Sequence, residues 1–413
     1  MPTPDISVLV TTYNRGCFLA ECLDSLLAQT LPPSQIIVIN DGSTDNTREV
    51  LQPYMARIKY LEKANGGKSS ALNFGLPHVT GEYVWTLDDD DVAFPDALER
   101  LAGLLARNPE LGFAYSSRCL ADTRAEDKRI QPAHEVPLPE FHEEEFFPRL
   151  LEGNFVLCPL VRTSCYQQIG GFREDLIRSQ DYEMAVRLAR HFRAGRVSGP
   201  TYYLRRHDGL RGSAADRFST KDTLRKWREY DKKIFRELRR ELDISEYLPR
   251  GAEHSAPVNR RRAYLQRAMV MASKGLDEEM VEDLALALVG PSSDVPLSEP
   301  EQAMLWRVTG NTWRVDELFS RTDLLRKVRE LCRTGVGREV QLELGRTLYW
   351  HMLNAWRRKN RRFAARVALA GCRLLGIRGA ARLLLHRLRV WASSGRSPSD
   401  AHGESPPQDA GGI

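Results

Sequence analysis

Short apolar runs alternate with amphipathic stretches through the first 120 residues, and this alternation constrains the fold more than any other feature. The apolar runs are rich in β-branched side chains and fall at residues 6–10, 35–40, 58–61, 82–87 and 111–116. The stretches between them repeat apolar side chains at helical spacing, at residues 18–27, 43–51, 69–76 and 94–107. Strands that alternate with helices are joined by crossover helices, which gives a mostly parallel sheet with helices on both faces. We therefore predict an α/β fold for this part of the chain.

The strand pattern resumes after an interruption and then fades from about residue 216. Residues 121–145 are polar, acidic and contain proline, which predicts a loop. Helical patterns later dominate, at residues 181–191, 221–241, 262–288 and 299–306. We therefore expect three parts, namely an α/β domain at 1–215, a mainly α-helical basic domain at 216–392, and a disordered tail rich in Ser, Pro and Gly at 393–413.

The composition excludes several classes of protein. Of the 413 residues, 42% are hydrophobic and 28% charged, so wholesale disorder and a disulfide-stapled miniature fold are excluded. The longest apolar stretches fall short of the ~18–20 residues that a membrane-spanning helix needs. The N-terminal MPTPDISVLV has no basic region before an apolar segment, and the seven scattered cysteines include no CxxC pair. We therefore expect free thiols and a cytoplasmic location.

The loops that follow the apolar runs are the candidate binding region, because ligands of parallel sheets bind at the carboxyl ends of the strands. The loops read TTYNR, NDGSTD, NGGKSS and DDDD. The first lacks the GxGxxG pattern of dinucleotide-binding folds, and Glu62 stands where a GxxxxGK phosphate loop needs glycine. The four aspartates at 88–91 directly follow an apolar strand, and carboxylates this close repel one another unless a cation neutralises them. This position favours a divalent-cation site over a solvated acidic loop.

Taken together, these motifs resemble the glycosyltransferases of family 2, which have the GT-A fold. The resemblance rests on six elements in order, namely SVLVTTYNR, QIIVINDGSTDNT, NGGKSSALNFGL, GEYVWTLDDDDV, GGFREDLIRSQDYEMAVRLAR and YYLRRH. It covers about residues 5–215, roughly half of the chain. It implies an enzyme that uses a nucleotide-sugar donor.

The resemblance implies a donor site built from the first four loops. Thr11 and Tyr13 would line the nucleotide pocket, with the tyrosine ring beside the base. Asn40 and Asp41 stand where the family usually has two aspartates, the first of which accepts a hydrogen bond from uracil. Because Asn40 is neutral, the identity of the base stays open. Lys68 would offset phosphate charge, and the alternative is that it is a solvated lysine. Asp88 and Asp89 would contact the nucleotide sugar, with Asp88 at the ribose.

The resemblance also implies a metal site. Asp90, in the DxD pattern that begins at Asp88, would coordinate Mg²⁺ or Mn²⁺ that bridges the donor diphosphate. A dication there would stabilise the charge that builds up as the nucleoside diphosphate departs. Arg205, Arg206 and His207 lie near the place where family members carry an Arg/His element over the diphosphate, and the resemblance assigns Arg206 to the donor and His207 to the metal. A solvated basic face is an equally good interpretation of these residues.

Asp181 is the general base that the resemblance implies, at the start of a predicted helix after Ser179 and Gln180. A carboxylate in the first turn of a helix is stabilised in its ionised form by the helix dipole. An inverting transfer needs such a carboxylate to accept the proton of the acceptor hydroxyl. The alternative is that Asp181 only caps the helix. Glu183 is a less favourable candidate for the same role.

The C-terminal half contains an unusually basic stretch, with thirteen Lys and Arg residues and no acid between Arg346 and Ser399. Apolar residues and tryptophans are interleaved with the charges at helical spacing, and glycines 371, 376 and 379 predict a division into two helices. One interpretation is a pair of helices that lies on an anionic membrane surface. An ordinary bundle with solvated arginines is slightly favoured, and nucleic-acid binding is not expected.

We therefore predict an inverting glycosyltransferase that moves a sugar from a nucleoside diphosphate sugar, expected to be UDP-linked, to a glycan, lipid-linked or other hydroxyl acceptor. Cell-envelope polysaccharide synthesis is the expected setting, with a cytoplasmic location and an optional peripheral contact at the inner face of the plasma membrane. Two alternatives stay open. One is a sugar nucleotidyltransferase, and the other is a catalytically silent scaffold that binds a membrane or partner through the basic C-terminal half.

Overall fold

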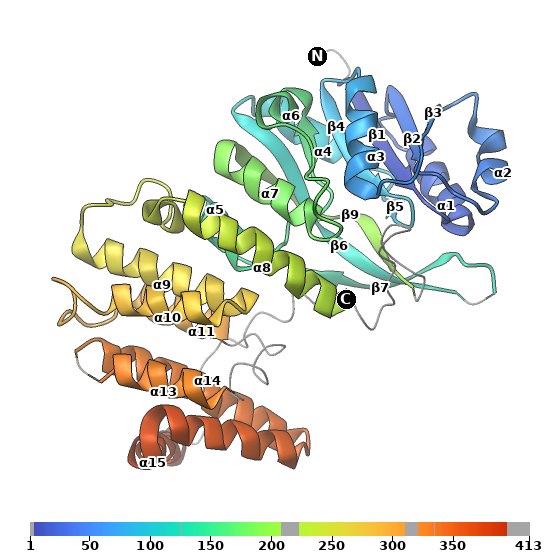
Figure 1. Ribbon diagram of the computed structural model, residues 1–413. Helices are drawn as coiled ribbons and strands as arrows, with labels where there is room; N and C mark the ends of the chain where they lie inside the picture. The colour runs from blue at the N-terminus through green and yellow to red at the C-terminus, as the bar shows by residue number, and fades with distance from the viewer. Residues whose placement is uncertain (1–3, 125, 208–222, 310–320, 334, 395–413) are drawn as a thin grey trace. The chain divides into compact units, whose positions relative to one another are not determined.

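The computed structural model describes residues 4–124, 126–207, 223–309, 321–333 and 335–394 (Figure 1). The described residues form two compact units, one with residues up to 140 and 153–230, and the other with residues 141–152 and those from 231 to 394. The boundary predicted at 215/216 and residues 395–413 of the predicted tail lie outside the described residues.

The first unit is built on one sheet, which the described residues form in the order β3-β2-β1-β4-β8-β6-β9-β5, with β7 beside β6. Its first four strands are parallel and follow the predicted apolar runs, at β1 Ile6–Thr12, β2 Gln35–Asn40, β3 Lys59–Glu62 and β4 Tyr83–Asp88. The loops that follow these four strands, TTYNR, NDGSTD, NGGKSS and DDDD, therefore lie along one edge of the sheet. The predicted α/β class is confirmed.

The remaining strands make the sheet mixed. They are β5 Val92–Ala93, β6 Leu111–Thr123, β7 Ile130–Val136, β8 Leu160–Arg162 and β9 Arg193–Arg206. Strand β8 is antiparallel to both β4 and β6, whereas β6 and β9 are parallel. The short strand β5 pairs antiparallel with β9, which brings β9 next to the loop that follows β4.

Helices cover both faces of this sheet. Successive residues of a strand point to opposite faces, so a strand that is apolar throughout has apolar side chains to bury on both sides. Val8 and Val10 of β1 lie in the core formed with helices α1 and α4, whereas Leu9 faces α3, where a Cβ on Gly75 would lie 3.3 Å from it. The helices and 3-10 turns of this unit are α1 Gly16–Leu27, α2 Thr47–Leu51, η1 Gln52–Tyr54, α3 Lys68–Gly75, η2 Leu76–His78, α4 Ala97–Arg107, α6 Thr163–Ile169 and α7 Gln180–His191.

The loop predicted at 121–145 is wrong at residues 121–123 and 130–136, which are strands. Strand β6 continues to Thr123, and β7 returns antiparallel to it as a hairpin (Figure 1). Most side chains of β7 are exposed, so the strand has no apolar alternation for a sequence pattern to detect. It is held by main-chain hydrogen bonds to β6, which composition does not reveal.

The second unit is helical among its described residues, as predicted for the C-terminal part. Its elements are η3 Glu143–Glu145, α5 Phe146–Glu152, η5 Ile244–Tyr247, α9 Pro257–Lys274, α10 Asp277–Ala287, α11 Glu299–Thr309, α13 Thr322–Leu331, α14 Gly337–Arg357 and α15 Arg361–Ser394. Helix α8 Thr223–Glu241 continues the chain from the first unit into the second.

Glycine interrupts the helical pattern of this unit twice. The helix predicted at 262–288 is wrong in its continuity, because Gly275 adopts φ 78° and ends α9 before α10 begins. Left-handed glycine is a common helix terminator since it has no Cβ. The predicted division of the basic stretch is confirmed at Gly376, where φ is 73° inside α15. Within the described residues, every helix is too short or too polar to cross a bilayer.

Candidate active site

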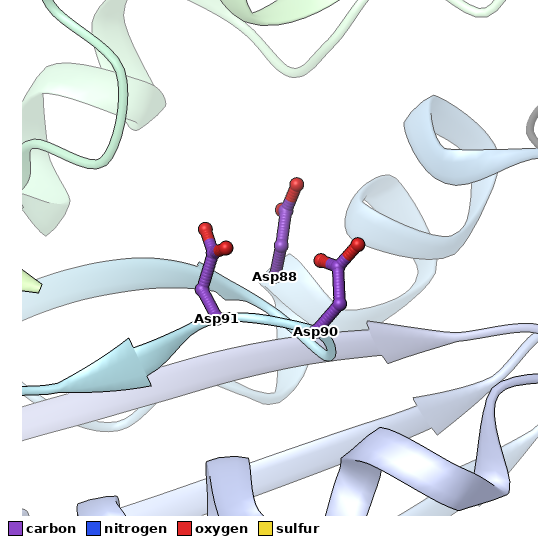
Figure 2. Close-up of side chains that lie close together, drawn as sticks. All are labelled: Asp88, Asp90 and Asp91. Carbon is purple, nitrogen blue, oxygen red and sulfur yellow. The ribbon is translucent and has the colours of Figure 1, made fainter. Parts of the chain in front are cut away.

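The loop that follows β4 brings three carboxylates together. Carboxylate oxygens of Asp88, Asp90 and Asp91 all lie within 4.8 Å of one another (Figure 2). Asp90 and Asp91 are buried and Asp88 is half-buried. Figure 2 shows the three side chains rising from this loop toward the same side. Sequence reasoning assigned roles to Asp88 and Asp90 but none to Asp91, although it belongs to the same run of aspartates.

Asp91 carries an unsatisfied acceptor in this cluster. Its Oδ1 accepts a hydrogen bond from the Arg205 main-chain N–H at 3.0 Å, whereas its buried Oδ2 has no hydrogen-bond partner among the described residues. Burial, reinforced by repulsion from Asp90 and Asp88, raises the pKa of Asp91 well above its usual value. A hard dication would satisfy these oxygens and relieve the repulsion. The three carboxylates therefore fit Mg²⁺ or Mn²⁺.

His207 lies beside the same cluster. Its side chain is only 5% exposed, and its Nε2 is 2.8 Å from Oδ2 of Asp90. The imidazole ring packs against Phe18, with 4.9 Å between the ring centroids. The structure therefore brings together Asp90 and His207, the two residues that the resemblance assigns to the metal.

Arg206 does not lie with His207. Its guanidinium pairs with Asp122 of β6 at 2.8 Å. The neighbouring Arg205 instead points to the aspartate loop, where its Nε donates to the main-chain oxygen of Asp90 at 2.6 Å. Because adjacent strand residues face opposite sides, only one arginine of this pair can serve the loop. Sequence reasoning placed both arginines near the diphosphate but assigned the donor contact to Arg206, and that assignment stays a prediction.

Asp89 is not part of the group of three carboxylates and is held by Arg15. The Nη1 atom of Arg15 lies 2.9 Å from Asp89 Oδ1 and 2.9 Å from Asp90 Oδ2. Burial raises the pKa of Asp89 to about 6, although the Arg15 charge opposes this rise. Burial likewise opposes the charge of Arg15, but Asp90 and Asp89 outweigh it and raise the pKa of the arginine. No local sequence pattern indicates this bridge.

Lys68 connects the aspartate loop to Asp181. It is the first residue of α3 and forms an ion pair with Asp88. Burial opposes the charge of Lys68, but Asp88 and Asp181 outweigh it and raise the pKa of the lysine. Both carboxylates must be near the ammonium group to have this effect. Asp181, which is half-buried in the first turn of α7, is therefore on the same side of the sheet edge as the carboxylate cluster.

Glu183, the less favourable base candidate, is engaged elsewhere. Arg187 binds it with two hydrogen bonds, of 2.7 Å from Nε and 2.9 Å from Nη2. The same arginine donates to the main-chain oxygens of Ile169 and Gly171 at 2.8 and 2.7 Å. Glu183 therefore helps to hold the turn before α7. Asp181, in contrast, accepts a hydrogen bond from the main-chain N–H of the next residue at 2.9 Å.

Asn40 and Asp41 are buried and tied to neighbouring loops. The Asn40 amide donates to the Tyr60 hydroxyl at 3.0 Å and accepts from the Ser43 N–H at 2.9 Å. Asp41 accepts from the main-chain N–H groups of residues 66 and 67 at 3.0 and 2.8 Å, and from the side chains of residues 63 and 65. These contacts shape the NDGSTD and NGGKSS loops. A direct contact with the nucleotide stays a prediction for both residues.

Thr11 and Tyr13 lie at the end of β1, next to these loops. Thr11 is opposite Asp88 in the β1–β4 ladder, and both Thr11 and Tyr13 are half-buried. The parallel strands thus bring the predicted donor residues of the first four loops to one edge of the sheet.

Residues 7–176 match the family model described as glycosyl transferase family 2. A glycosyltransferase of Rickettsia felis, uncharacterised by its name, is 34% identical over 192 residues, which are 45% of this chain and 32% of that protein. Residues 7–176 are thus similar to glycosyl transferase family 2. That part contains the four loops and the carboxylate cluster, whereas Asp181 and His207 lie beyond it.

Other relatives are named as synthases of glycan polymers. The chondroitin synthase of Pasteurella multocida is 28% identical over 194 residues, which are 45% of this chain and 19% of that protein. The chain thus spans only a minor part of the length of this synthase and of the Rickettsia felis protein. Among solved structures, S. aureus TarS in complex with UDP-GlcNAc is similar with a TM-score of 0.42 and 16% identity, over 89% of this chain and 91% of that one.

Proposed function

We propose that this chain is an inverting glycosyltransferase of family 2 that uses a nucleoside diphosphate sugar, UDP-linked, and a hydroxyl acceptor. The proposal rests on one observation. Asp88 belongs to a carboxylate cluster that fits a dication, and Lys68 is influenced by both Asp88 and Asp181. A place for a diphosphate and a place for a proton acceptor are therefore adjacent.

In this proposal, Asp88, Asp90, Asp91 and His207 hold Mg²⁺ or Mn²⁺. When bound, the ion neutralises phosphate charge as a Lewis acid. Lys68 adds a positive charge beside the diphosphate. Loss of a nucleoside diphosphate leaves negative charge on its oxygens, so fixed cations at this place lower the barrier to departure.

Asp181 is the general base in this proposal. It removes the proton of the acceptor hydroxyl as that oxygen bonds to the anomeric carbon, while the electrons of the carbon–oxygen bond leave with the diphosphate. The helix N-terminus keeps the carboxylate ionised before the reaction. Attack opposite the leaving group inverts the anomeric centre. Asp181 then holds the proton until solvent removes it.

The acceptor in this proposal is a growing glycan or a lipid-linked saccharide. The chondroitin and hyaluronan synthases of Pasteurella multocida, each 28% identical over 194 residues, support a glycan acceptor and a role in cell-envelope polysaccharide synthesis. This support is partial, because the matched region is 19% of each of those proteins.

Peripheral contact with the inner face of the plasma membrane is part of the same proposal. All seven residues from 356 to 362, WRRKNRR, are exposed at the turn between α14 and α15. Trp356 is 63% exposed, and the Arg361 guanidinium lies over its ring, 5.9 Å from the centroid. An interfacial tryptophan among cations suits anionic headgroups. Binding to phosphatidylglycerol vesicles but not phosphatidylcholine vesicles supports this contact, and equal retention by both contradicts it.

A thermal-shift panel tests the central proposal. UDP and UDP-sugars with Mn²⁺ should raise the melting temperature, because a ligand that binds only the folded state stabilises it. ADP and GDP sugars are the matched comparison. Release of UDP in a turnover assay supports the transferase, whereas release of pyrophosphate identifies a nucleotidyltransferase. Binding without turnover of any donor identifies a silent scaffold, and no shift with any nucleotide contradicts the proposal.

A further inference from the structure

Arg118 of β6 is a buried arginine without a partner. The residue is 5% exposed, and its enclosed Nε has no hydrogen-bond partner. Across the part of the chain that the structure describes, its guanidinium forms neither a hydrogen bond nor an ion pair. Other buried arginines differ. Arg205 binds Glu21 and two main-chain oxygens, and Arg261 binds Glu301 and three main-chain oxygens.

An unpaired buried guanidinium is costly for the fold. Arginine does not lose its proton in proteins, so it cannot escape the penalty by becoming neutral. Buried charges are for this reason normally paired or hydrogen-bonded. A chain that keeps such a charge without a protein partner is expected to gain something from it in another state, such as a complex with an anion.

The nearest acid on the adjacent strand does not provide the missing partner. Glu135 of β7 accepts a hydrogen bond from Ser117 Oγ at 2.6 Å and is opposite Cys119 in the ladder. Ser117 and Cys119 share one face of β6, and Arg118 points to the other face. Val136, which is opposite Arg118, is apolar.

The face of Arg118 leads to the candidate active site. Strand β9 separates β6 from β5 in the sheet, so Arg118 lies about two strand spacings, roughly 10 Å, from β5. Tyr202 of β9 is opposite Ala93 of β5, two residues after Asp91. Burial raises the pKa of Tyr202 well above its usual value, and the Arg118 charge opposes this rise, which places the guanidinium near the phenol.

Cys158 continues the connection from Tyr202 to the proposed base. The Cys158 thiol contributes to the raised pKa of Tyr202, which places the two groups close to one another. Burial raises the pKa of Cys158. The charges of Asp91, Asp88, Lys68 and Asp181 also affect this pKa, so these groups lie near the thiol. Arg118, Tyr202 and Cys158 therefore form a line of side chains that ends at the site where the proposed transfer takes place.

We propose that Arg118 binds an anionic group, a carboxylate or a phosphate, on the carbohydrate that reacts beside Asp181. This inference rests on the proposed function, and it assigns the substrate to an acidic class. The planar guanidinium presents paired N–H donors that match the two oxygens of such a group. The group belongs either to the acceptor or to the sugar of the donor, and the experiment separates these sources.

The experiment compares ligands that differ only in the anionic group. The acceptor arm uses methyl β-D-glucuronide against methyl β-D-glucoside, and glycerol 3-phosphate against glycerol, each titrated with UDP and Mn²⁺ present. The donor arm uses UDP-glucuronic acid against UDP-glucose with Mn²⁺. Calorimetry is performed on the wild type, Arg118→Gln, Arg118→Lys and, as an exposed control from the same hairpin, Arg124→Gln.

The wild type should bind the anionic member of at least one pair at least about tenfold tighter, as expected for a charge-assisted contact. Arg118→Gln should abolish this preference, Arg118→Lys should keep part of it, and Arg124→Gln should keep it in full. The arm that shows the preference identifies its source. A wild type without a charge preference in either arm, or a preference that survives Arg118→Gln, overturns the inference.

Thermal unfolding distinguishes a ligand-binding role from a structural one. Arg118→Met removes an uncompensated charge, so its melting temperature should equal or exceed that of the wild type. A melting temperature clearly below that of Arg124→Gln overturns the inference. Failure of the proposed function has a different signature, because the wild type then fails to bind UDP with Mn²⁺. Arg118→Gln should retain UDP binding.

Discussion

The Nε2 atom of His207 lies 2.8 Å from Oδ2 of Asp90, with the imidazole ring enclosed against Phe18. The two residues are far apart in sequence and come together because β9 runs beside the loop that follows β4. A neutral imidazole and a carboxylate can share a dication. Without the ion, the same pair is a hydrogen bond that fixes the ring in position.

We expect His207→Ala to weaken Mn²⁺ binding by about 10- to 100-fold, the range typical for loss of a group that tunes or orients a metal site. Calorimetric titration with Mn²⁺ in the absence of nucleotide measures this directly. His191→Ala, an exposed histidine of the same unit, is the control and should bind Mn²⁺ as the wild type does. Equal Mn²⁺ affinity in His207→Ala and His191→Ala would remove His207 from the metal site.

Arg15 should compete with the metal, because its Nη1 bridges Asp89 and Asp90 at 2.9 Å. We expect Arg15→Met to raise Mn²⁺ affinity by at least about fivefold, which corresponds to about 1 kcal/mol of relieved competition. The same variant should melt at a lower temperature without metal, since the aspartates lose a counter-charge. Arg57→Met is the exposed control. Weaker Mn²⁺ binding by Arg15→Met would instead show that the arginine organises the loop for the ion.

Asp181→Asn should reduce turnover by about 10²- to 10⁴-fold while UDP binding persists, because an amide cannot accept the acceptor proton. Glu183→Gln provides the comparison. Its side chain is bound by Arg187, so its loss should mainly lower the melting temperature and reduce turnover far less. A larger loss of turnover in Glu183→Gln than in Asp181→Asn would exchange the two roles.

Much of this architecture can be predicted from the sequence, because burial patterns carry the information. The parallel strands β1, β2 and β4 are apolar runs, and polar loops follow each of them. Parallel order then brings these loops to one edge without further information. The carboxylate cluster could be predicted for the same reason, since its residues are neighbours in sequence.

Other features depend on contacts that no local pattern reveals. Whether Arg205 or Arg206 faces the aspartate loop depends on the register of β9 against β5 and β6, and one residue of slip exchanges them. The bridge from Arg15 to Asp89 joins residues 74 positions apart. That the Arg118 Nε has no hydrogen-bond partner among the described residues can be seen only from the positions of its neighbours in the fold.

The buried Arg261–Glu301 pair of the second unit yields a prediction about stability. Both side chains are almost fully enclosed, and Nε of Arg261 is 2.8 Å from Oε1 of Glu301. Removing one partner leaves a buried charge, so Arg261→Met should lower the free energy of unfolding by about 3–5 kcal/mol. The double variant with Glu301→Leu should recover most of this loss. Arg236→Gln, which breaks an exposed pair with Glu279, should cost at most about 1 kcal/mol.

The same pair predicts how stability depends on pH. Burial pulls the Glu301 pKa upward, but hydrogen bonds from Arg261 and Ser298 outweigh it and hold the pKa below the ordinary 4.5. A carboxyl with a depressed folded pKa contributes stability that is complete above its unfolded pKa and is lost as pH falls through the folded value. Urea unfolding should therefore show a difference between the wild type and Glu301→Gln that is constant from pH 7 to about 5.5 and shrinks below about 4.5. A difference that stays constant down to pH 3 would mean that the carboxylate gains nothing from Arg261.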